Sequence, residues 1–228
     1  MALLPGHHWA PGRPRSHNDG HRDEDTLRRV HPRMHTGRMR LFAAVLPPDD
    51  VTRHLAAEVE ALRRLPDADA LRWTGRPGWH FTLAFYGEVA DTLVPDLSAR
   101  LERAAHRTPA FPLALRGGGQ FGHGRVLWTG ADGDTATLRL LADRAEAAGR
   151  KAGLPMGEHR HYKAHLTVAR SRRAVDPRPY VDELRDFAGQ RWTVRELVLV
   201  RSHLPRSGTP GEGPRYEAVA RWPLDGAR

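Results

Sequence analysis

The chain has 228 residues, a formal net charge of +9 and no cysteine. This length is sufficient for one large domain with a buried core, and the absence of cysteine excludes disulfides, thiolate metal sites and a cysteine nucleophile. No apolar run reaches the roughly 18 residues that span a bilayer, and the first residues lack the charged and apolar regions of a secretory signal. We therefore expect a soluble, monomeric, cytoplasmic protein without a membrane partner.

Arginine carries nearly all of the positive charge, since Lys151 and Lys163 are the only lysines. A basic surface attracts polyanions such as nucleic acid. The chain is also rich in Ala, Gly and Pro, which share GC-rich codons with arginine, so genome composition is an alternative explanation of the bias. The charge alone does not identify a nucleic-acid partner.

Residues 1–38 differ from the rest of the chain because they show no sustained hydrophobic period and contain few apolar side chains. Such a segment is predicted to be a disordered N-terminal extension. It holds six of the fourteen histidines, but no pair there has the spacing of an ordered metal site. Residues 39–228 are predicted to form a single domain.

From residue 39 onward, strand-like and helix-like patterns alternate as in a mixed α/β domain. The start of the first helix, at 47–65, is indicated by Pro48 with the acidic pair Asp49 and Asp50. We expect strands at 39–47, 71–74, 79–87, 163–170, 191–202 and 214–224, helices at 47–65, 91–107, 134–153 and 175–189, and two strands around a glycine-rich loop within 111–130.

The order of these elements contains a repetition. A strand, a helix and a second strand occur within 39–88 and again within 111–170. The second strand of each repeat carries the pattern H-apolar-T-apolar-A, and the two histidines, His80 and His165, are 85 residues apart. This spacing predicts two similar lobes that each supply one such strand.

The two motifs are HFTLA and HLTVA. In an extended strand, residues i and i+2 point to the same face, so His80 and Thr82 project together, as do His165 and Thr167. One H-x-T is expected by chance in this chain, but two copies with matching apolar and alanine positions are not. The alternative is that both segments are ordinary strands with a solvated polar face.

Two imidazoles and two threonine hydroxyls favour one type of chemistry. Imidazoles with pKa values near neutrality act as base and acid in one turnover. The threonine hydroxyls hold phosphate oxygens and stabilise the charge of a pentacoordinate transition state. Neither motif contains a carboxylate that would orient a histidine toward a serine or a metal. The set fits in-line phosphodiester cleavage.

These residues carry a resemblance to a known family. The two motifs, with RLFAAVLPP, RVLW, VRELVLVRS and RYEAVARWPL, resemble the 2H phosphoesterase superfamily, and within it the bacterial RNA 2′,3′-cyclic phosphodiesterases, formerly described as 2′-5′ RNA ligases. The resemblance covers about residues 39–223. It implies an α/β (α+β) bilobal fold, in which two pseudo-symmetric lobes of mainly antiparallel sheet carry helices on the outside and face a central cleft.

The resemblance also implies an activity: opening of terminal 2′,3′-cyclic phosphates on RNA ends to 2′-phosphates, without a metal or another cofactor. Carried over to matching positions, His80 is the proton donor and His165 the proton acceptor that activates water. Thr82 and Thr167 bind the phosphate, and Arg170 adds a cationic contact. The donor and acceptor labels rest wholly on the resemblance, because the two motifs are nearly identical.

Two of the candidate residues have a competing structural explanation. Arg170 stands five positions after its histidine and falls on the opposite strand face unless the strand ends or bulges first, so it is otherwise a surface arginine. Phe42, on the first strand, is a candidate for stacking on a nucleobase. Its alternative role is core packing.

Other sites and functions stay open. His159, His161 and His165 could be read as metal ligands on a helix, but the expected glutamate is absent and LTVA favours a strand. Residues 117–119 are all glycine without the lysine of a phosphate-binding loop, so we expect a plain loop. The alternative functions are a 2H activity on another small cyclic phosphate or a 2′-5′ linkage, and a non-catalytic RNA-end binder.

Overall fold

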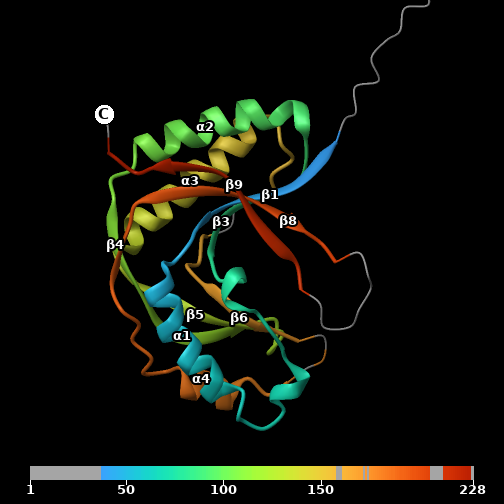
Figure 1. The fold of residues 1–228 in the computed structure, drawn as a ribbon, viewed down its shortest axis with the longest axis vertical. Helices are drawn as coiled ribbons and strands as arrows, with labels where there is room; N and C mark the ends of the chain where they lie inside the picture. The colour runs from blue at the N-terminus through green and yellow to red at the C-terminus, as the bar shows by residue number, and fades with distance from the viewer. Residues whose placement is uncertain (1–36, 158–160, 172, 174, 206–212, 227–228) are drawn as a thin grey trace, which may run out of the picture. The chain divides into compact units, whose positions relative to one another are not determined.

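The structure is a computed structural model, and it describes residues 37–157, 161–171, 173, 175–205 and 213–226. These residues form nine strands, four α-helices and three short 3-10 turns (Figure 1). The strands are β1 (Arg38–Val45), β2 (Arg72–Trp73), β3 (Phe81–Ala90), β4 (Phe111–Phe121), β5 (Val126–Gly133), β6 (Leu166–Arg170), β7 (Trp192–Val194), β8 (Glu196–His203) and β9 (Arg215–Pro223). The helices are α1 (Asp49–Leu62), α2 (Val94–His106), α3 (Thr135–Lys151) and α4 (Arg178–Glu183), and the 3-10 turns are η1 (Ala68–Ala70), η2 (Arg76–Gly78) and η3 (Asp91–Leu93).

All strand pairs are antiparallel, and the strands form one sheet in the order β7-β4-β5-β6-β3-β1-β8-β9, with β2 paired to β6. At the centre, β3 and β6 share a single residue pair, Phe81 with Leu166. This narrow junction separates a first half of the sheet (β3, β1, β8, β9) from a second half (β6, β2, β5, β4, β7). The predicted α+β class with two sets of antiparallel strands is confirmed.

Two of the helices, α1 and α3, are exchanged between the two halves. α3 follows β5 of the second half but packs on β3 of the first, where the Tyr86 hydroxyl donates a hydrogen bond of 3.0 Å to the Ala145 carbonyl. α1 follows β1 of the first half but lies beside the second half (Figure 1), where His54 meets Phe187 edge-on at 5.5 Å. The core of each half therefore contains side chains from both repeats.

The sequence explains why α3 forms where it does. Its N-cap is Asp134, whose side chain accepts a hydrogen bond of 2.9 Å from the backbone N–H of Thr137, and this satisfies one of the free amide groups of the first turn. Leu138, Leu141 and Ala145 follow at helical spacing and are fully buried. Burying such an apolar stripe is the main source of stability for a helix of this length.

Two expected elements were wrong. The glycines at 117–119 do not form a loop, because β4 continues through them to Phe121 and the turn comes after it. A side chain at Gly119 would overlap the indole of Trp128, and one at Gly118 would overlap Leu184, so glycine is required for packing rather than for turning. The strand expected at 191–202 is divided at Arg195 into β7, which pairs with β4, and β8, which pairs with β1.

The predicted N-terminal extension lies outside the described residues except for its last two, and Arg38 already begins β1. Within the described part of the chain, no helix combines the length and the apolar composition needed to cross a membrane.

Candidate active site

Both histidine motifs lie where the two halves of the sheet meet. His80 stands one position before β3, and His165 stands one position before β6. The next residue in each case, Phe81 or Leu166, belongs to the pair that joins the halves and is fully buried in the main core. The histidines therefore flank the junction on the face of the sheet that is turned away from this core.

A polar pocket of about 60 Å³ lies at this junction. This volume suits a phosphate group rather than a whole nucleotide. The structure brings five of the predicted residues together in its wall and adds three that the sequence did not indicate. The lining residues are Thr74, Gly78, His80, Thr82, His165, Thr167, Arg170 and Tyr216.

A β-bulge follows the threonine of each motif. In β3 the extra residue is Leu83, and in β6 it is Val168, since each stands between two residues that pair with consecutive residues of the neighbouring strand. Because of the bulge, the extra residue and the alanine after it, Ala84 or Ala169, both point to the buried side. The residue after the alanine therefore points to the same face as the pocket. This explains why Arg170 lines the pocket despite its unfavourable spacing from the histidine.

Each histidine is held by the backbone two residues before it. His165 Nδ1 donates a hydrogen bond of 2.8 Å to the carbonyl oxygen of Lys163, and His80 makes a backbone hydrogen bond with Gly78. A carbonyl partner at Nδ1 keeps the proton of the neutral ring on that nitrogen. For His165 this leaves Nε2 as the nitrogen that accepts or gives a proton.

Burial shifts both histidines toward the neutral form. It lowers the pKa of His80 to about 4, and it also lowers the pKa of His165. The charge of Arg170 lowers the pKa of both rings further, while the backbone hydrogen bonds oppose the shift. Both rings are therefore mainly neutral at pH 7, and an anion bound beside Arg170 would raise both pKa values by offsetting the arginine charge.

Two aromatic rings pack against each histidine. The ring of His80 lies 4.7 Å from that of Phe42 and 5.1 Å from that of Tyr216, measured between centroids. The ring of His165 lies 4.9 Å from Phe121 and 6.4 Å from Trp128. These contacts restrict the rotation of each imidazole and exclude water from it, which is the origin of the lowered pKa values.

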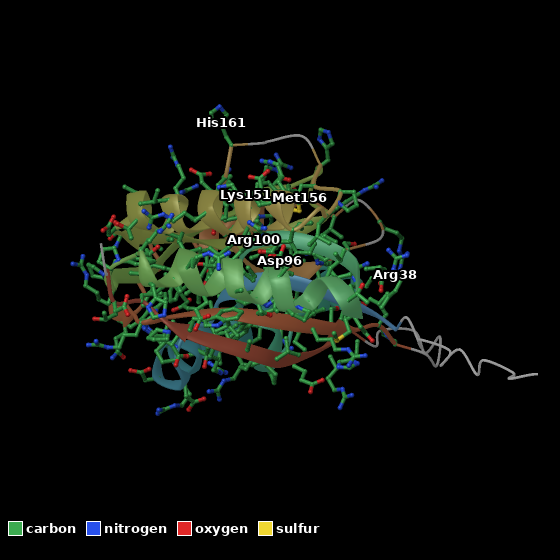
Figure 2. The ribbon with its side chains drawn as sticks, turned by 90° about the horizontal axis from the view of Figure 1, so that it is seen from above. Arg38, Asp96, Arg100, Lys151, Met156 and His161 are labelled. Carbon is green, nitrogen blue, oxygen red and sulfur yellow. The ribbon has the colours of Figure 1, made fainter. Side chains whose placement is uncertain are left out.

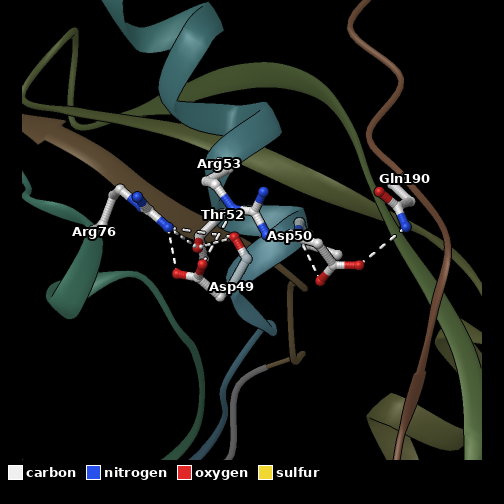
Figure 3. Close-up of polar contacts among 7 residues, drawn as sticks. Asp49, Asp50, Thr52, Arg53, Arg76 and Gln190 are labelled. Carbon is white, nitrogen blue, oxygen red and sulfur yellow. Dashed lines mark hydrogen bonds and ion pairs between the residues drawn. The ribbon is translucent and has the colours of Figure 1, made fainter.

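The turn before His80 is anchored to the start of α1 (Figure 3). Arg76, the first residue of η2, pairs with the carboxylate of Asp49 and donates to Thr52 Oγ1 at 3.2 Å. Asp50, the residue after Asp49 in α1, accepts a hydrogen bond of 3.0 Å from Gln190, which precedes β7. The N-terminus of α1 therefore links the turn that holds the backbone partner of His80 to the second half of the sheet.

Phe42 has a different position from that of the pocket residues. Its side chain is only 3% exposed and belongs to a small apolar cluster with Ala44, Val198 and Val200. The Phe42 ring does not line the pocket but packs against the ring of His80. This agrees with the packing role that the sequence also allowed, and stacking of Phe42 on a base stays a prediction.

Thr74, Gly78 and Tyr216 were missed for a common reason. Each comes from a segment distant from the motifs or from a turn, and no spacing in the sequence indicates that it reaches the pocket. Gly78 is enclosed by its two companions, since a Cβ there would lie 2.8 Å from Thr74 Cγ2 and 3.3 Å from Tyr216 Cε2. Burial raises the pKa of the Tyr216 hydroxyl, so this group is a neutral hydrogen-bond donor.

The helical arrangement considered for His161 and His165 is wrong, because the chain from His161 to β6 forms no helix. His161 is exposed and projects outward in Figure 2, whereas His165 faces the pocket. His159 lies outside the described residues. Among the residues that the structure does describe, no three His, Asp or Glu side chains come together as a metal site.

The sequence matches a family model over residues 48–206, and that model describes the 2′-5′ RNA ligase superfamily. The match covers more than half of the chain, so the protein belongs to this superfamily. The resemblance to 2H phosphoesterases noted from the two motifs is confirmed.

Individual relatives agree with this assignment. An RNA 2′,3′-cyclic phosphodiesterase of Thermus thermophilus is 34% identical over 82% of this chain and 91% of its own length. A protein of the same name from Geobacillus stearothermophilus is 30% identical over 68% of this chain, which spans only 48% of that longer protein. The crystal structure of E. coli LigT in its apo form matches 83% of this chain and 99% of its own, with a TM-score of 0.65 and 26% identity.

Proposed function

We propose that the protein hydrolyses the terminal 2′,3′-cyclic phosphate of RNA to a 2′-phosphomonoester by acid–base catalysis with His80 and His165, and without a metal. The observation that carries the proposal is the pocket in which the two histidines, the two motif threonines and Arg170 converge. The names of the Thermus and Geobacillus relatives support the substrate.

In this mechanism, His165 Nε2 removes a proton from water, and the water oxygen forms a bond to phosphorus. The bond between phosphorus and the ribose 3′-oxygen breaks on the opposite side. His80 gives its proton to that oxygen, so that the products are a 3′-hydroxyl and a 2′-phosphate. The transfer leaves His165 protonated and His80 neutral, and exchange with water resets the pair.

Thr82 and Thr167 donate their hydroxyl protons to the non-bridging oxygens of the phosphate. Arg170 adds a positive charge to the same side, since its guanidinium lies 3.5 Å from Thr167 Oγ1. The transition state carries one more negative charge than the bound cyclic ester, so these three groups stabilise it more than the substrate. This difference lowers the activation barrier.

Because the pKa of His80 is low, the bound phosphate must also raise that pKa before His80 can act as the proton donor. A proton donor must be charged at the start of the reaction, yet burial lowers the pKa of His80 to about 4. The bound phosphate anion raises this pKa, so that substrate binding is accompanied by proton uptake. The site becomes ready for acid catalysis only when it is occupied.

The test is phosphorus NMR of a short RNA with a 2′,3′-cyclic phosphate end, incubated with the full-length protein and a chelator. We expect the cyclic signal to be replaced by that of a 2′-phosphomonoester. A 3′-phosphate product, loss of activity with chelator, or no turnover of a bound substrate would each contradict the proposal. The last result would favour a non-catalytic RNA-end binder, and turnover of a 2′-5′ linkage alone would favour a related 2H activity.

A further inference from the structure

Outside the pocket, an exposed aromatic residue and an arginine form a pair on the first half of the sheet. Phe85 is 48% exposed, and among the described residues it is the only aromatic one with so much free surface. The guanidinium carbon of Arg40 lies 4.6 Å from the centre of its ring. Phe42 is buried and Tyr216 is partly buried beside His80, so this exposed ring is unusual.

The strand register places Phe85 on the same face as the pocket. Phe85 pairs with Phe42 across β1 and β3, so the two side chains leave the sheet on the same side. Phe42 contacts His80 on that side. The bulge at Leu83 has the same effect, since it returns Phe85 to the face of Thr82, at roughly 10 Å along the strand.

Positive charge connects the pair to the pocket. Arg40 lies 3.9 Å from the carboxylate of Glu88, and its side chain is 36% exposed. The charges of Arg170, Arg72 and Arg40 all lower the pKa of the Tyr216 hydroxyl, against the effect of burial. Arg40 therefore acts electrostatically on a residue of the pocket wall, and the surface between them favours a phosphate chain.

We propose that Phe85 and Arg40 bind the nucleotide that precedes the terminal cyclic phosphate, with its base stacked on Phe85 and its phosphate paired with Arg40. The inference rests on the proposed function and extends it. The pocket holds little more than the reacting phosphate, so the rest of the RNA strand lies outside it. A single exposed ring with a nearby cation binds single-stranded nucleic acid without preference for a base.

The proposal predicts a preference for substrates longer than one nucleotide. We compare kcat/KM of the full-length protein on a nucleoside 2′,3′-cyclic phosphate and on a short single-stranded RNA with the same terminal nucleotide. The wild-type protein prefers the RNA. In Phe85→Ala the ratio of the two kcat/KM values falls about tenfold, mainly through KM for the RNA, and Phe85→Tyr retains the preference because it keeps the ring.

The role of Arg40 is tested separately, through the salt dependence of kcat/KM. Loss of one phosphate contact to a single strand reduces the slope of log kcat/KM against log salt concentration by about 0.7, so Arg40→Ala should show this smaller slope on the RNA. Matched controls are Leu140→Ala, an exposed apolar residue on α3, and Arg100→Ala on α2 (Figure 2). Neither belongs to the pocket or to the proposed contact, and both keep the wild-type ratio and salt slope.

The outcomes separate this inference from the proposed function. Wild-type turnover of neither substrate would overturn both. Turnover of both substrates without preference, or an equal loss on both in Phe85→Ala, would overturn the inference and leave the activity intact. An equal loss would mean that Phe85 contacts the terminal nucleotide instead.

Discussion

The β3 and β6 segments use the same backbone device but place different groups at its end. In both, a histidine precedes the strand and bonds to the backbone two residues earlier, and a bulge follows the threonine. After the bulge, β3 presents the exposed ring of Phe85, whereas β6 presents the charge of Arg170. Under the proposed function, the repeated part would supply the common chemistry, and the part that differs would contact different portions of the substrate.

The two histidines also differ in their surroundings. Gly78, in the turn before His80, packs between Thr74 and Tyr216, and Arg76 in the same turn pairs with Asp49 of α1. His165 follows Lys163, whose ammonium group lies 4.7 Å from the ring centre of Trp128. Burial is the largest cause of the lowered pKa of both histidines, and the shift is large for His80. The donor role proposed for His80 therefore requires a bound phosphate that would raise its pKa.

The largest effect is expected from removing either histidine. His80→Ala and His165→Ala should each lower kcat by roughly 10²-fold or more, because each removes one proton-transfer group. Rapid-quench assays of RNA cyclic phosphate opening measure this, with His161→Ala as a control at an exposed histidine. Activity near that of the wild type in either variant would show that the two motifs do not act as a pair.

A smaller effect is expected from the phosphate contacts. Thr82→Ala and Thr167→Ala should each lower kcat/KM by about 10- to 100-fold, the range for a hydrogen bond to a charged group. The corresponding Thr→Ser variants keep the hydroxyl and most of the activity. Steady-state kinetics on all four variants test the equivalence of the two motifs, and a loss confined to one threonine would show that only one half of the sheet holds the phosphate.

Removing the anchor of the first motif should have a modest effect. Arg76→Ala leaves the η2 turn without its contacts to Asp49 and Thr52 and should lower kcat by roughly fivefold or less, since exposed ion pairs contribute little. Arg76→Lys restores part of the loss. An NMR titration of the His80 ring distinguishes a positioning role, which shifts its pKa, from a purely structural one, which lowers the melting temperature alone.

The last effect concerns stability against acid and not activity at neutral pH. The pKa of His80 is about 4 in the folded protein and about 6.5 in an unfolded chain, so the unfolded state binds the proton first. The contribution of His80 to the free energy of unfolding is fully present above pH 6.5 and is lost as the pH falls toward 4. His80→Gln lacks this contribution, and its melting temperature should fall less over that range, by about 10 °C. Parallel curves for both proteins would contradict the low pKa.

The sequence predicted the parts of the site that depend on local pattern. The motif pairs His80 with Thr82 and His165 with Thr167 are readable because a strand places i and i+2 on one face. The bulge that brings Arg170 into the pocket was a condition stated from the sequence but not visible in it, since a bulge depends on the register with a neighbouring strand.

The rest of the site was not predictable because it depends on long-range packing. Tyr216 reaches His80 from a strand near the C-terminus, and no local period indicates that contact. The glycines of β4 resembled a loop because glycine is common in turns. Here Gly119 and Gly118 provide space for Trp128 and Leu184, and Gly117 has a positive φ at a bulge in the strand. The exchange of α1 and α3 between the two halves is also invisible to local patterns.

The pH dependence of kcat/KM for RNA cyclic phosphate opening, measured in the wild type and in both histidine-to-alanine variants, tests the central claim most directly. The wild type should give a bell-shaped profile centred below pH 6.5, because both free histidines have lowered pKa values. His165→Ala should lose the acidic limb, which reports the base, and His80→Ala should lose the alkaline limb, which reports the acid. A variant that keeps both limbs would contradict paired-histidine catalysis, and exchanged limbs would contradict the assigned roles.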